Sequence, residues 1–323
     1  MTDRQPKQVS EELGMEPLVM EIPKKVFQHA WDDMDEAQQR LFFSKNGFLV
    51  VPEIFSAAEV AAMHKEIESL GLEDKNIDMS EAFCRASTFA PMIDNPKLTS
   101  ALKSIFGPEF VCFKGAYVPK KSKAKGVPPQ RTALHVDYGI LEPEGDYRNS
   151  SALWVNVICY LSDMTLEHAP LSIVPGSHTR YDLQPASDME MLKEEAVTLL
   201  TKAGDAVIFL HNTVHAGGVN VSGYTQHMVF CSYRASWARH IGHVREWPKA
   251  FVDSAPPSRR RLISDLNFGA LERGAPVFVH RYFPPFLLKK VSELLSTVGG
   301  LLGSPKIKKL GDRLWAAHSA RKS

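Results

Sequence analysis

The chain contains 323 residues, of which 44% are hydrophobic and 23% are charged. This composition is typical of an ordinary globular protein with one large domain or two smaller ones. The formal net charge of +1 gives no electrostatic basis for bulk binding to nucleic acid, so we expect no nucleic-acid partner. Because the sequence has no apolar leader segment and no run of about 18 apolar residues, we expect a cytoplasmic protein without a transmembrane segment.

The N-terminal part predicts an arm followed by a helix. Residues 1–30 are polar and of mixed charge, and we expect them to form a flexible arm. Either Asp33 or Asp35 can cap a helix that continues to about Lys45. The residues expected to face the core from this helix are Leu41, Phe42 and Phe43.

Two further helices and one strand are expected before residue 109. The Asn46–Gly47 pair predicts a turn into a short β-rich run at 48–51. Ser56, followed three residues later by Glu59, has the pattern of a capping box and predicts the start of a second helix. Another helix is expected at 96–106. Apolar residues recur at helical spacing in the second helix at Val60, Met63, Ile67 and Leu70.

Residues 109–237 have a different pattern, in which short β-rich runs are separated by turn residues. Several short strands at this spacing indicate a sandwich or barrel. No alternation of strands and helices is found, which argues against a doubly wound fold. The expected fold is therefore mainly β with flanking helices. The runs lie at 109–118, 131–137, 152–161, 171–174, 196–200, 205–210 and 226–234.

The four cysteines are scattered and form no CxxC pair. Three of them lie in apolar runs, where we expect buried, reduced thiols of the kind found in a reducing compartment. These three are Cys112, Cys159 and Cys231.

The C-terminal part predicts an amphipathic helix at 287–302, with an apolar stripe opposite charged residues. Packing on the barrel or on a second copy of the chain is the favoured use, which would make a homodimer. The basic tail leaves docking on a membrane surface as the alternative. We therefore divide the chain into an arm at 1–30, a β domain with its N-terminal helices at 31–245, and a helical extension at 246–323.

The pair His135 and Asp137 indicates a metal site. Residues two apart on an extended strand point to the same face, so one imidazole and one carboxylate form half of a site. His215 is the best candidate for a third ligand, and His211 and His178 are weaker rivals. Two histidines and one carboxylate form the facial triad of non-haem Fe(II) oxygenases. The alternative is a chance pair.

The sequence resembles the phytanoyl-CoA dioxygenase family of Fe(II)/2-oxoglutarate oxygenases. The resemblance covers roughly residues 40–240, and its combination of motifs is specific although each motif alone is weak. By this resemblance the fold is a double-stranded β-helix, or jelly roll, with helices on its outside. The landmarks are Asn46–Pro52 with Phe55 and Glu59, Leu134–Asp137, Trp154 with Leu161–Thr165 and Val174–His178, and Gly204–Asp205 through His215 to Asn220.

The resemblance implies specific roles. His135, Asp137 and His215 would hold Fe(II), and 2-oxoglutarate and molecular oxygen would take the remaining positions of the metal. His178, in the Pro-Gly-Ser-His turn, would be structural. The residues expected to contact the co-substrate are Lys114, Thr132, Trp154, Gly217, Gln226 and Arg234.

Two positions depart from the family pattern. Relatives normally carry an arginine about eleven residues after the distal histidine, where it pairs with the 5-carboxylate of 2-oxoglutarate; this chain has Gln226. The departure leaves three readings open: another cation (Lys114 or Arg234) takes its place, the co-substrate differs or binds weakly, or the oxygenase reaction has been lost. The second departure is at 168–169, where His168 replaces a common asparagine and Ala169 replaces a glycine.

We therefore expect an Fe(II)/2-oxoglutarate-dependent dioxygenase that hydroxylates or otherwise oxidises a small hydrophobic molecule, lipid-like or a secondary metabolite. The first alternative is a metal protein of the same fold that has lost 2-oxoglutarate oxidation, such as an isomerase. Gln226 favours it. The second alternative is a non-catalytic partner, for which Asp137→Ala would leave function intact.

Overall fold

The computed structural model divides into two compact units, Met1–Ile263 and Ser264–Ser323. In the second unit four residues are described, and the three of them that lie within 287–302 are helical, so the predicted helix at 287–302 and its homodimer role lie mostly outside the described residues. No helix of the described residues has the length and apolar character needed to cross a membrane. The structure describes residues 20–21, 25–27, 31, 34–73, 79–123, 128, 130–137, 154–180, 189–238, 247–264, 294–295 and 297.

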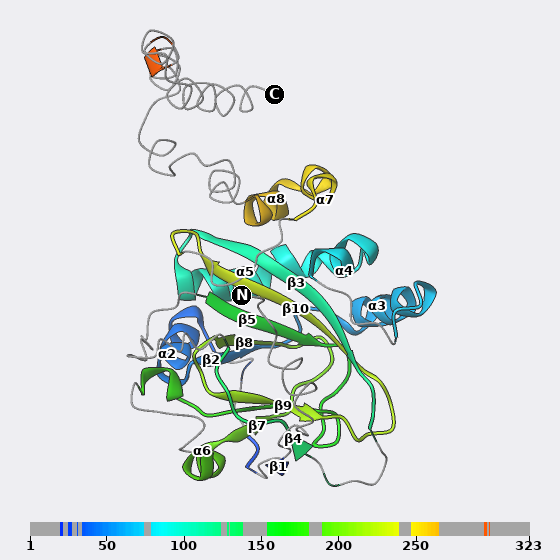
Figure 1. Ribbon diagram of the computed structural model, residues 1–323, viewed down its shortest axis with the longest axis vertical. Coiled ribbons are helices and arrows are strands. Elements are labelled where there is room, and N and C mark those ends of the chain that lie inside the picture. The colour runs from blue at the N-terminus through cyan, green and yellow to red at the C-terminus, as the bar shows by residue number, and fades with distance from the viewer. Residues whose placement is uncertain are drawn as a thin grey trace. The chain divides into compact units, whose positions relative to one another are not determined.

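Two antiparallel sheets form the centre of the first unit (Figure 1). The first sheet has the order β2-β8-β5-β10-β3, with β2 (Phe48–Val51), β8 (Ala206–Leu210), β5 (Trp154–Tyr160), β10 (Gln226–Ala235) and β3 (Phe110–Lys120). The second sheet has the order β1-β4-β9-β6-β7, with β1 (Met20–Glu21), β4 (Gln130–Arg131), β9 (His215–Val219), β6 (Leu171–Ile173) and β7 (Val197–Leu199).

The alternation of side chains along the first sheet builds two cores. Ile158 and Tyr160 of β5 point between the two sheets, where they pack with Leu171 and Ile173 of β6. The intervening residues point to the opposite face of the same sheet, because successive side chains of a strand alternate; Val157 is one of them. Two stacked antiparallel sheets around a shared core are the predicted jelly roll, and the predicted fold class is confirmed.

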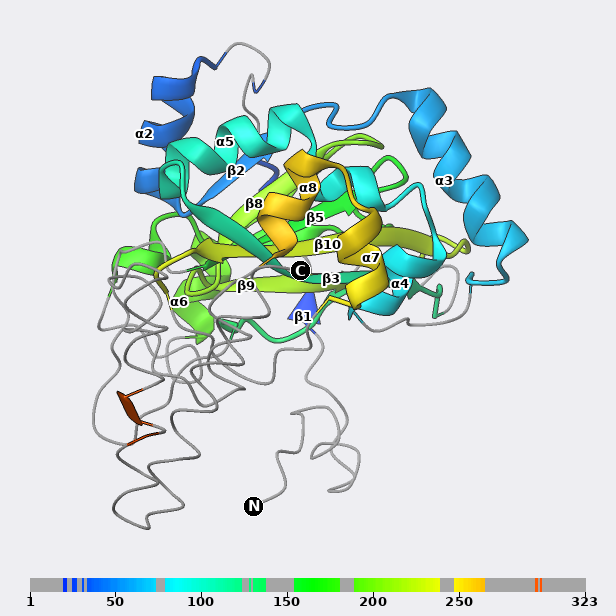
Figure 2. The same ribbon diagram turned by 90° about the horizontal axis from the view of Figure 1, so that it is seen from above.

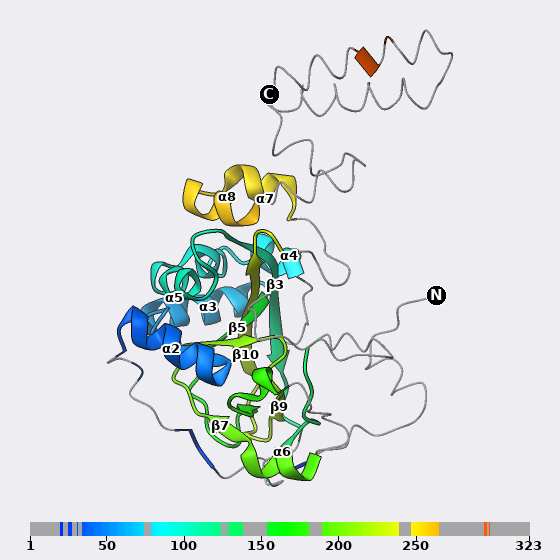
Figure 3. The same cartoon turned by 90° about the vertical axis from the view of Figure 1, so that its left-hand side faces the viewer.

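Helices cover the outer face of the first sheet (Figures 2 and 3). Their buried residues, such as Met63 and Leu98, join the core on that face. The helices are α2 (Glu36–Asn46), α3 (Ala57–Ser69), α4 (Met79–Arg85), α5 (Pro96–Phe106), α7 (Lys249–Ser254) and α8 (Pro257–Ile263), with α6 (Met189–Glu195) beside the second sheet. The helix predicted at 96–106 is confirmed as α5.

The two predicted N-terminal caps are confirmed. Asp35, one of the two candidates, accepts a hydrogen bond of 2.8 Å from the backbone N–H of Gln38 and completes a capping box. Ser56 and Glu59 form the second capping box, as predicted. One expectation for α2 is wrong: the Leu41 side chain is 72% exposed, since the helix buries a narrower stripe than its apolar residues suggest.

The chain before α2 is not wholly separate from the barrel. β1 pairs with β4, and the backbone N–H of Phe27 donates to the carbonyl oxygen of Thr198 at 3.0 Å. Residues 1–19 lie outside the described residues. The division into an arm at 1–30, a domain at 31–245 and an extension at 246–323 therefore stays a prediction.

The second sheet departs from the sequence prediction in two places. The strand expected at 131–137 is only β4 followed by an isolated bridge between His135 and His215. His215, expected after the end of a strand, instead begins β9. Glycines are unfavourable in strands and hid β9 in the sequence. Gly218 is nevertheless needed there, because a Cβ at this position would lie 2.5 Å from the Cα of Ala169.

The expectation of buried, reduced thiols is confirmed for all three cysteines that lie in apolar runs. Cys112, Cys159 and Cys231 are buried and free, whereas Cys84 is free and exposed. Burial raises the pKa of Cys159 and Cys231 well above the usual value, because a thiolate would lose its hydration there. These thiols therefore act as small apolar groups of the core.

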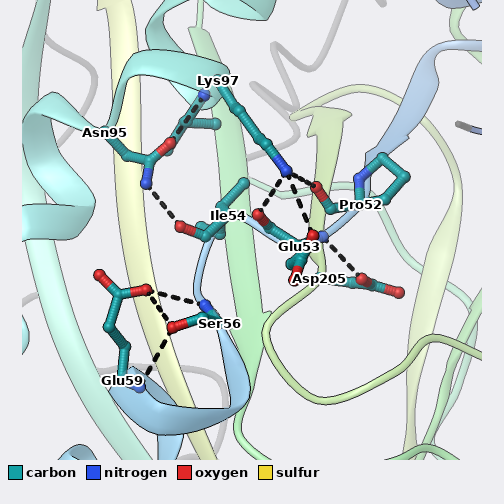
Figure 4. A network of polar contacts seen from close by, with 9 residues as sticks. Pro52, Glu53, Ile54, Ser56, Glu59, Asn95, Lys97 and Asp205 are labelled. Carbon is teal, nitrogen blue, oxygen red and sulfur yellow. Dashed lines mark hydrogen bonds and ion pairs between the residues drawn. The ribbon is translucent and has the colours of Figure 1, made fainter.

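A network of backbone contacts ties the chain between β2 and α3 to the turn before β8 (Figure 4). Asp205 accepts the backbone N–H of Glu53 at 2.9 Å and that of Lys202 at 2.8 Å. Glu53 has a positive φ of 46°, and the ammonium of Lys97 donates to its carbonyl oxygen at 2.9 Å. These bonds hold a strained turn in one conformation.

Ala169 provides a test of the second departure from the family pattern. Its φ is 55°, a left-handed conformation that costs a residue with a Cβ about 1–2 kcal/mol. Glycine avoids this cost but loses about 0.5–1 kcal/mol through the entropy of the unfolded chain. We expect Ala169→Gly to raise the free energy of unfolding by about 0.5–1 kcal/mol, as measured by urea denaturation. A lower stability would show that the Ala169 methyl group contributes more through packing than its backbone conformation costs.

Candidate active site

Three candidate ligand side chains lie together at one end of the space between the sheets. The ligand atoms of His135, Asp137 and His215 are all within 4.8 Å of one another. The Nε2 atom of His215 is 3.6 Å from one Asp137 oxygen, and that of His135 is 3.9 Å from the other. The His215 side chain is 6% exposed and that of His135 is 48% exposed. The cluster is thus buried on one side and accessible on the other.

Backbone hydrogen bonds fix how both imidazoles point. Nδ1 of His135 is 3.0 Å from the carbonyl oxygen of Ala133, and Nδ1 of His215 is 2.8 Å from that of Thr213. A carbonyl oxygen only accepts, so each Nδ1 carries the proton and each Nε2 presents a lone pair. Metal-binding histidines are oriented in this way. The donor set of two imidazoles and one carboxylate with an open side fits Fe(II).

A row of polar side chains on the first sheet supports the carboxylate. The amide nitrogen of Asn156 on β5 donates to Asp137. Ser232 on β10 donates to the amide oxygen of Asn156 at 2.7 Å, and Lys114 on β3 is the cross-strand partner of Ser232. Asp137 therefore has a hydrogen-bond partner that restricts its rotation before any metal binds.

Neither rival histidine belongs to the group of ligand atoms formed by His135, Asp137 and His215. His211 stacks on Trp154 with ring centroids 5.2 Å apart. Its backbone carbonyl oxygen accepts from the N–H of Asp137 at 2.8 Å, and its imidazole interacts with the backbone of Asp137. His178 is 1% exposed, and its Nε2 is 3.0 Å from the carbonyl oxygen of Ser44. His178 thus holds the turn before β2, in keeping with its expected structural role.

Burial gives His211 a pH-dependent effect on stability. Loss of hydration lowers its pKa to about 4, although Asp137 acts in the opposite direction. Between pH 6.5 and 4 the unfolded chain binds the proton and the folded chain does not, so stability falls as the pH falls through this window. We expect His211→Phe, which keeps an aromatic ring against Trp154, to reduce this loss by about 2 kcal/mol between urea denaturation at pH 7 and at pH 4.5. If the stability of this variant depended on pH as that of the wild type does, His211 would not be the group responsible.

The predicted co-substrate residues are divided between two regions. Gln226 begins β10 and is 1% exposed. Arg234 is eight residues further along the same strand, roughly 26 Å away, beside Trp154. Its guanidinium donates to the carbonyl oxygens of Ala235, Ser236 and Ala238. Arg234 therefore does not lie in the region of Gln226.

Gly217 lies near Gln226 at the other end of the site, two residues after His215 on β9. Thr132 donates from its backbone N–H to the carbonyl oxygen of Gly217 at 3.0 Å, and its side chain is exposed. The ammonium of Lys120 lies here too: a Cβ on Gly217 would be 2.9 Å from Lys120 Nζ. Sequence reasoning missed Lys120, because it begins a basic run and only the pairing of β3 with β10 places it opposite Gln226.

The family model for phytanoyl-CoA dioxygenase (PhyH) matches residues 43–228, which include all three clustered side chains. The chain belongs to the phytanoyl-CoA dioxygenase family. The predicted family is therefore confirmed. The predicted enzyme class, an Fe(II)/2-oxoglutarate-dependent dioxygenase with these two cofactors, is confirmed at the level of the family.

Curated relatives share this family's chemistry by name. The ectoine dioxygenase of Bordetella parapertussis is 23% identical over 241 residues, which cover 63% of this chain and 76% of that protein. The iron/alpha-ketoglutarate-dependent dioxygenase penM of Penicillium thymicola is 28% identical over 133 residues, which cover 40% of this chain and 41% of that protein. Both matches are distant and do not fix the substrate of this chain.

Two solved structures have a similar fold. HygX from Streptomyces hygroscopicus, with nickel and 2-oxoglutarate bound, matches with a TM-score of 0.52 at 17% identity, covering 62% of this chain and 86% of that chain. The carbocyclase SnoK from nogalamycin biosynthesis matches with a TM-score of 0.50 at 18% identity, covering 65% of this chain and 87% of that chain. At these identities the likeness establishes the fold alone.

Proposed function

We propose that this protein oxidises a small hydrophobic molecule and that His135, Asp137 and His215 hold the Fe(II) it uses. The observation that carries the proposal is the cluster itself: three donors within 4.8 Å, with both imidazoles turned so that Nε2 faces the carboxylate. When bound, the iron supplies the redox chemistry of oxygen activation. The protein positions the reactants and keeps the buried side of the site free of water.

The balance of the reaction is that of a 2-oxoglutarate-dependent hydroxylation. One atom of molecular oxygen enters a C–H bond of the substrate and becomes a hydroxyl group. The other enters the co-substrate, which loses carbon dioxide and leaves as succinate. The four electrons that reduce oxygen come in equal shares from the substrate and from 2-oxoglutarate, so no further reductant is needed.

An aromatic wall supports a hydrophobic substrate. Trp154 packs against Phe113 with ring centroids 5.5 Å apart and stacks on His211. The low pKa of His211 keeps that ring uncharged at neutral pH. Phe209 also contacts the ring of His215, at 4.6 Å between centroids. Aromatic and neutral groups around a small polar centre are typical of small-molecule sites.

The name of one relative supports a small-molecule substrate in general. The ectoine dioxygenase is named for a small molecule, and the proposal extends a small-molecule substrate to this chain. We further propose a cytoplasmic location. A homodimer through the C-terminal helix stays a prediction, since that helix lies mostly outside the described residues.

The test is turnover by the purified protein with Fe(II), 2-oxoglutarate and oxygen. A panel of hydrophobic lipids and natural products is compared with a panel of charged metabolites. We expect a hydrophobic compound to raise succinate formation and to gain one oxygen atom by mass spectrometry. Succinate formation that responds only to charged compounds would contradict the substrate class. Iron binding without any succinate formation would favour the alternative that the oxidation has been lost.

A further inference from the structure

We propose that Lys120 binds the distal carboxylate of 2-oxoglutarate and supplies the positive charge that Gln226 lacks. This inference rests on the proposed function, since it concerns the co-substrate of the same site. Lys120 ends β3 and is the direct cross-strand partner of Gln226 on β10. Directly opposed residues of an antiparallel pair have Cβ atoms about 4.5–5.5 Å apart. The two side chains therefore flank one region.

The side chain of Lys120 reaches from the first sheet to the second. Its Nζ atom donates to the carbonyl oxygen of Gly218 at 3.3 Å. It also occupies the space where Gly217 lacks a side chain, since a Cβ there would lie 2.9 Å from Nζ. An ammonium group is thus held against β9 by a backbone acceptor, at a position that only glycine leaves open.

The spacing along β9 matches the shape of a 2-oxo dicarboxylic acid. His215 and Gly217 are two residues apart, roughly 7 Å along a strand, and their side-chain positions face the same way. A 2-oxo acid chelates a metal through its 1-carboxylate and ketone oxygen. Its second carboxylate is then carried away from the metal by two methylene groups. The ammonium beside Gly217 lies at the far end of such a molecule.

The wall between these two ends is apolar, as the methylene groups require. Ile158 and Met228 of the first sheet and Leu171 of the second sheet are buried in the shared core, and Leu171 is the cross-strand partner of Gly217. Val118, two residues before Lys120, packs against the same core. Apolar walls with a charged group at one end favour a ligand of matching polarity.

Gln226 supplies an independent sign that a polar group is bound here. It is 1% exposed, and its Oε1 atom has no hydrogen-bond partner among the described residues. Its Nε2 donates only to the sulfur of Met164, at 2.9 Å, and sulfur is a weak acceptor. Turning the amide by half a turn gives up that weak bond and presents two N–H donors to a carboxylate.

The two cations favoured by the sequence are less well placed. Lys114 is the cross-strand partner of Ser232, in the row of side chains that supports Asp137. It therefore lies level with the metal ligands rather than beyond them. Arg234 is further away in the same direction, and its guanidinium donates to three backbone carbonyl oxygens. Of these three cations, Lys120 is the one adjacent to both Gln226 and Gly217.

The experiment compares two 2-oxo acids that differ only at the distal end. The purified protein with Fe(II) is titrated anaerobically with 2-oxoglutarate and with 2-oxopentanoate, in which a methyl group replaces the distal carboxylate. Binding is followed by the visible charge-transfer band. We expect Lys120→Met to raise the Kd for 2-oxoglutarate by about 10- to 100-fold, which is the effect of losing a charged hydrogen bond. The Kd for 2-oxopentanoate should not change. Lys120→Arg should keep the preference for 2-oxoglutarate.

The control is Lys114→Met, which removes the same charge from the same face of β3. It should leave the ratio of the two affinities as in the wild type. The proposal would be overturned if Lys114→Met selectively lost affinity for 2-oxoglutarate, or if Lys120→Met lost affinity for both acids equally. Gly217→Ala, which displaces the ammonium without removing its charge, should also weaken 2-oxoglutarate selectively. The absence of any band in the wild type despite bound iron would instead contradict the proposed function, and this inference with it.

Discussion

Asp137→Ala should raise the Kd for Fe(II) by more than about 100-fold and reduce turnover to background. The carboxylate is the only anionic donor in the cluster, and its removal leaves two imidazoles to hold a divalent cation. A change in the hydrogen-bond partner of a ligand typically costs about 10–100-fold in metal affinity, so loss of the ligand itself should cost more. Competition with a metal-sensitive dye under anaerobic conditions measures the Kd.

Two further variants test whether the loss of Fe(II) affinity is specific to the Asp137 carboxylate. Asn156→Leu removes the hydrogen bond to Asp137 and keeps the ligand, so its Kd should rise by about 10–100-fold. Asp253→Ala removes an exposed carboxylate paired with Lys249 on α7 and should change nothing. Equal effects of Asp137→Ala and Asp253→Ala would contradict the assignment, and so would a fully active Asp137→Ala protein, which is the result that a non-catalytic partner would give.

Gly204→Ala should lower the free energy of unfolding by about 3–5 kcal/mol, which is large for one methyl group. Gly204 has a φ of +90°, and a Cβ there would lie 2.1 Å from the carbonyl oxygen of Phe55. The clash is with backbone, and the two segments are joined by the bond from Phe55 N–H to the Gly204 carbonyl oxygen, at 3.2 Å. Neither segment can move without breaking the network around Asp205 (Figure 4).

Gly71→Ala is the matched control. Gly71 also has a positive φ, of +57°, but a Cβ there would meet nothing within 4 Å. It should therefore cost only the conformational strain of about 1–2 kcal/mol. The free energies of unfolding of the two variants, measured by urea denaturation, separate the cost of backbone strain from the cost of the steric clash. Equal losses in both would contradict the close approach of Gly204 to Phe55.

The first ligand pair and most of the fold could be predicted from local patterns. Capping boxes at Asp35 and Ser56 depend on residues three apart, and His135 and Asp137 depend on residues two apart. Such features are visible in sequence because they involve neighbours along the chain. The strand runs were also found where side chains alternate or are continuously apolar, as in Trp154–Tyr160.

The missing parts depend on contacts between distant segments. β9 contains two adjacent glycines, and the need for Gly218 appears only when Ala169 packs against it. Lys120 looks like any residue of a basic surface run until β3 pairs with β10 and places it opposite Gln226. Sequence reasoning therefore detected that the usual arginine is missing and favoured Lys114 or Arg234 as its replacement. Both side chains lie on the same face of the first sheet as Gln226, but away from Gln226 along the strands.

The most direct test of the metal assignment is an anomalous difference map at the iron edge from crystals grown with Fe(II) under anaerobic conditions. We expect one peak within bonding distance of His135 Nε2, His215 Nε2 and an Asp137 oxygen. A peak bonded to His211, or no peak at the three side chains in protein that contains iron, would contradict the account.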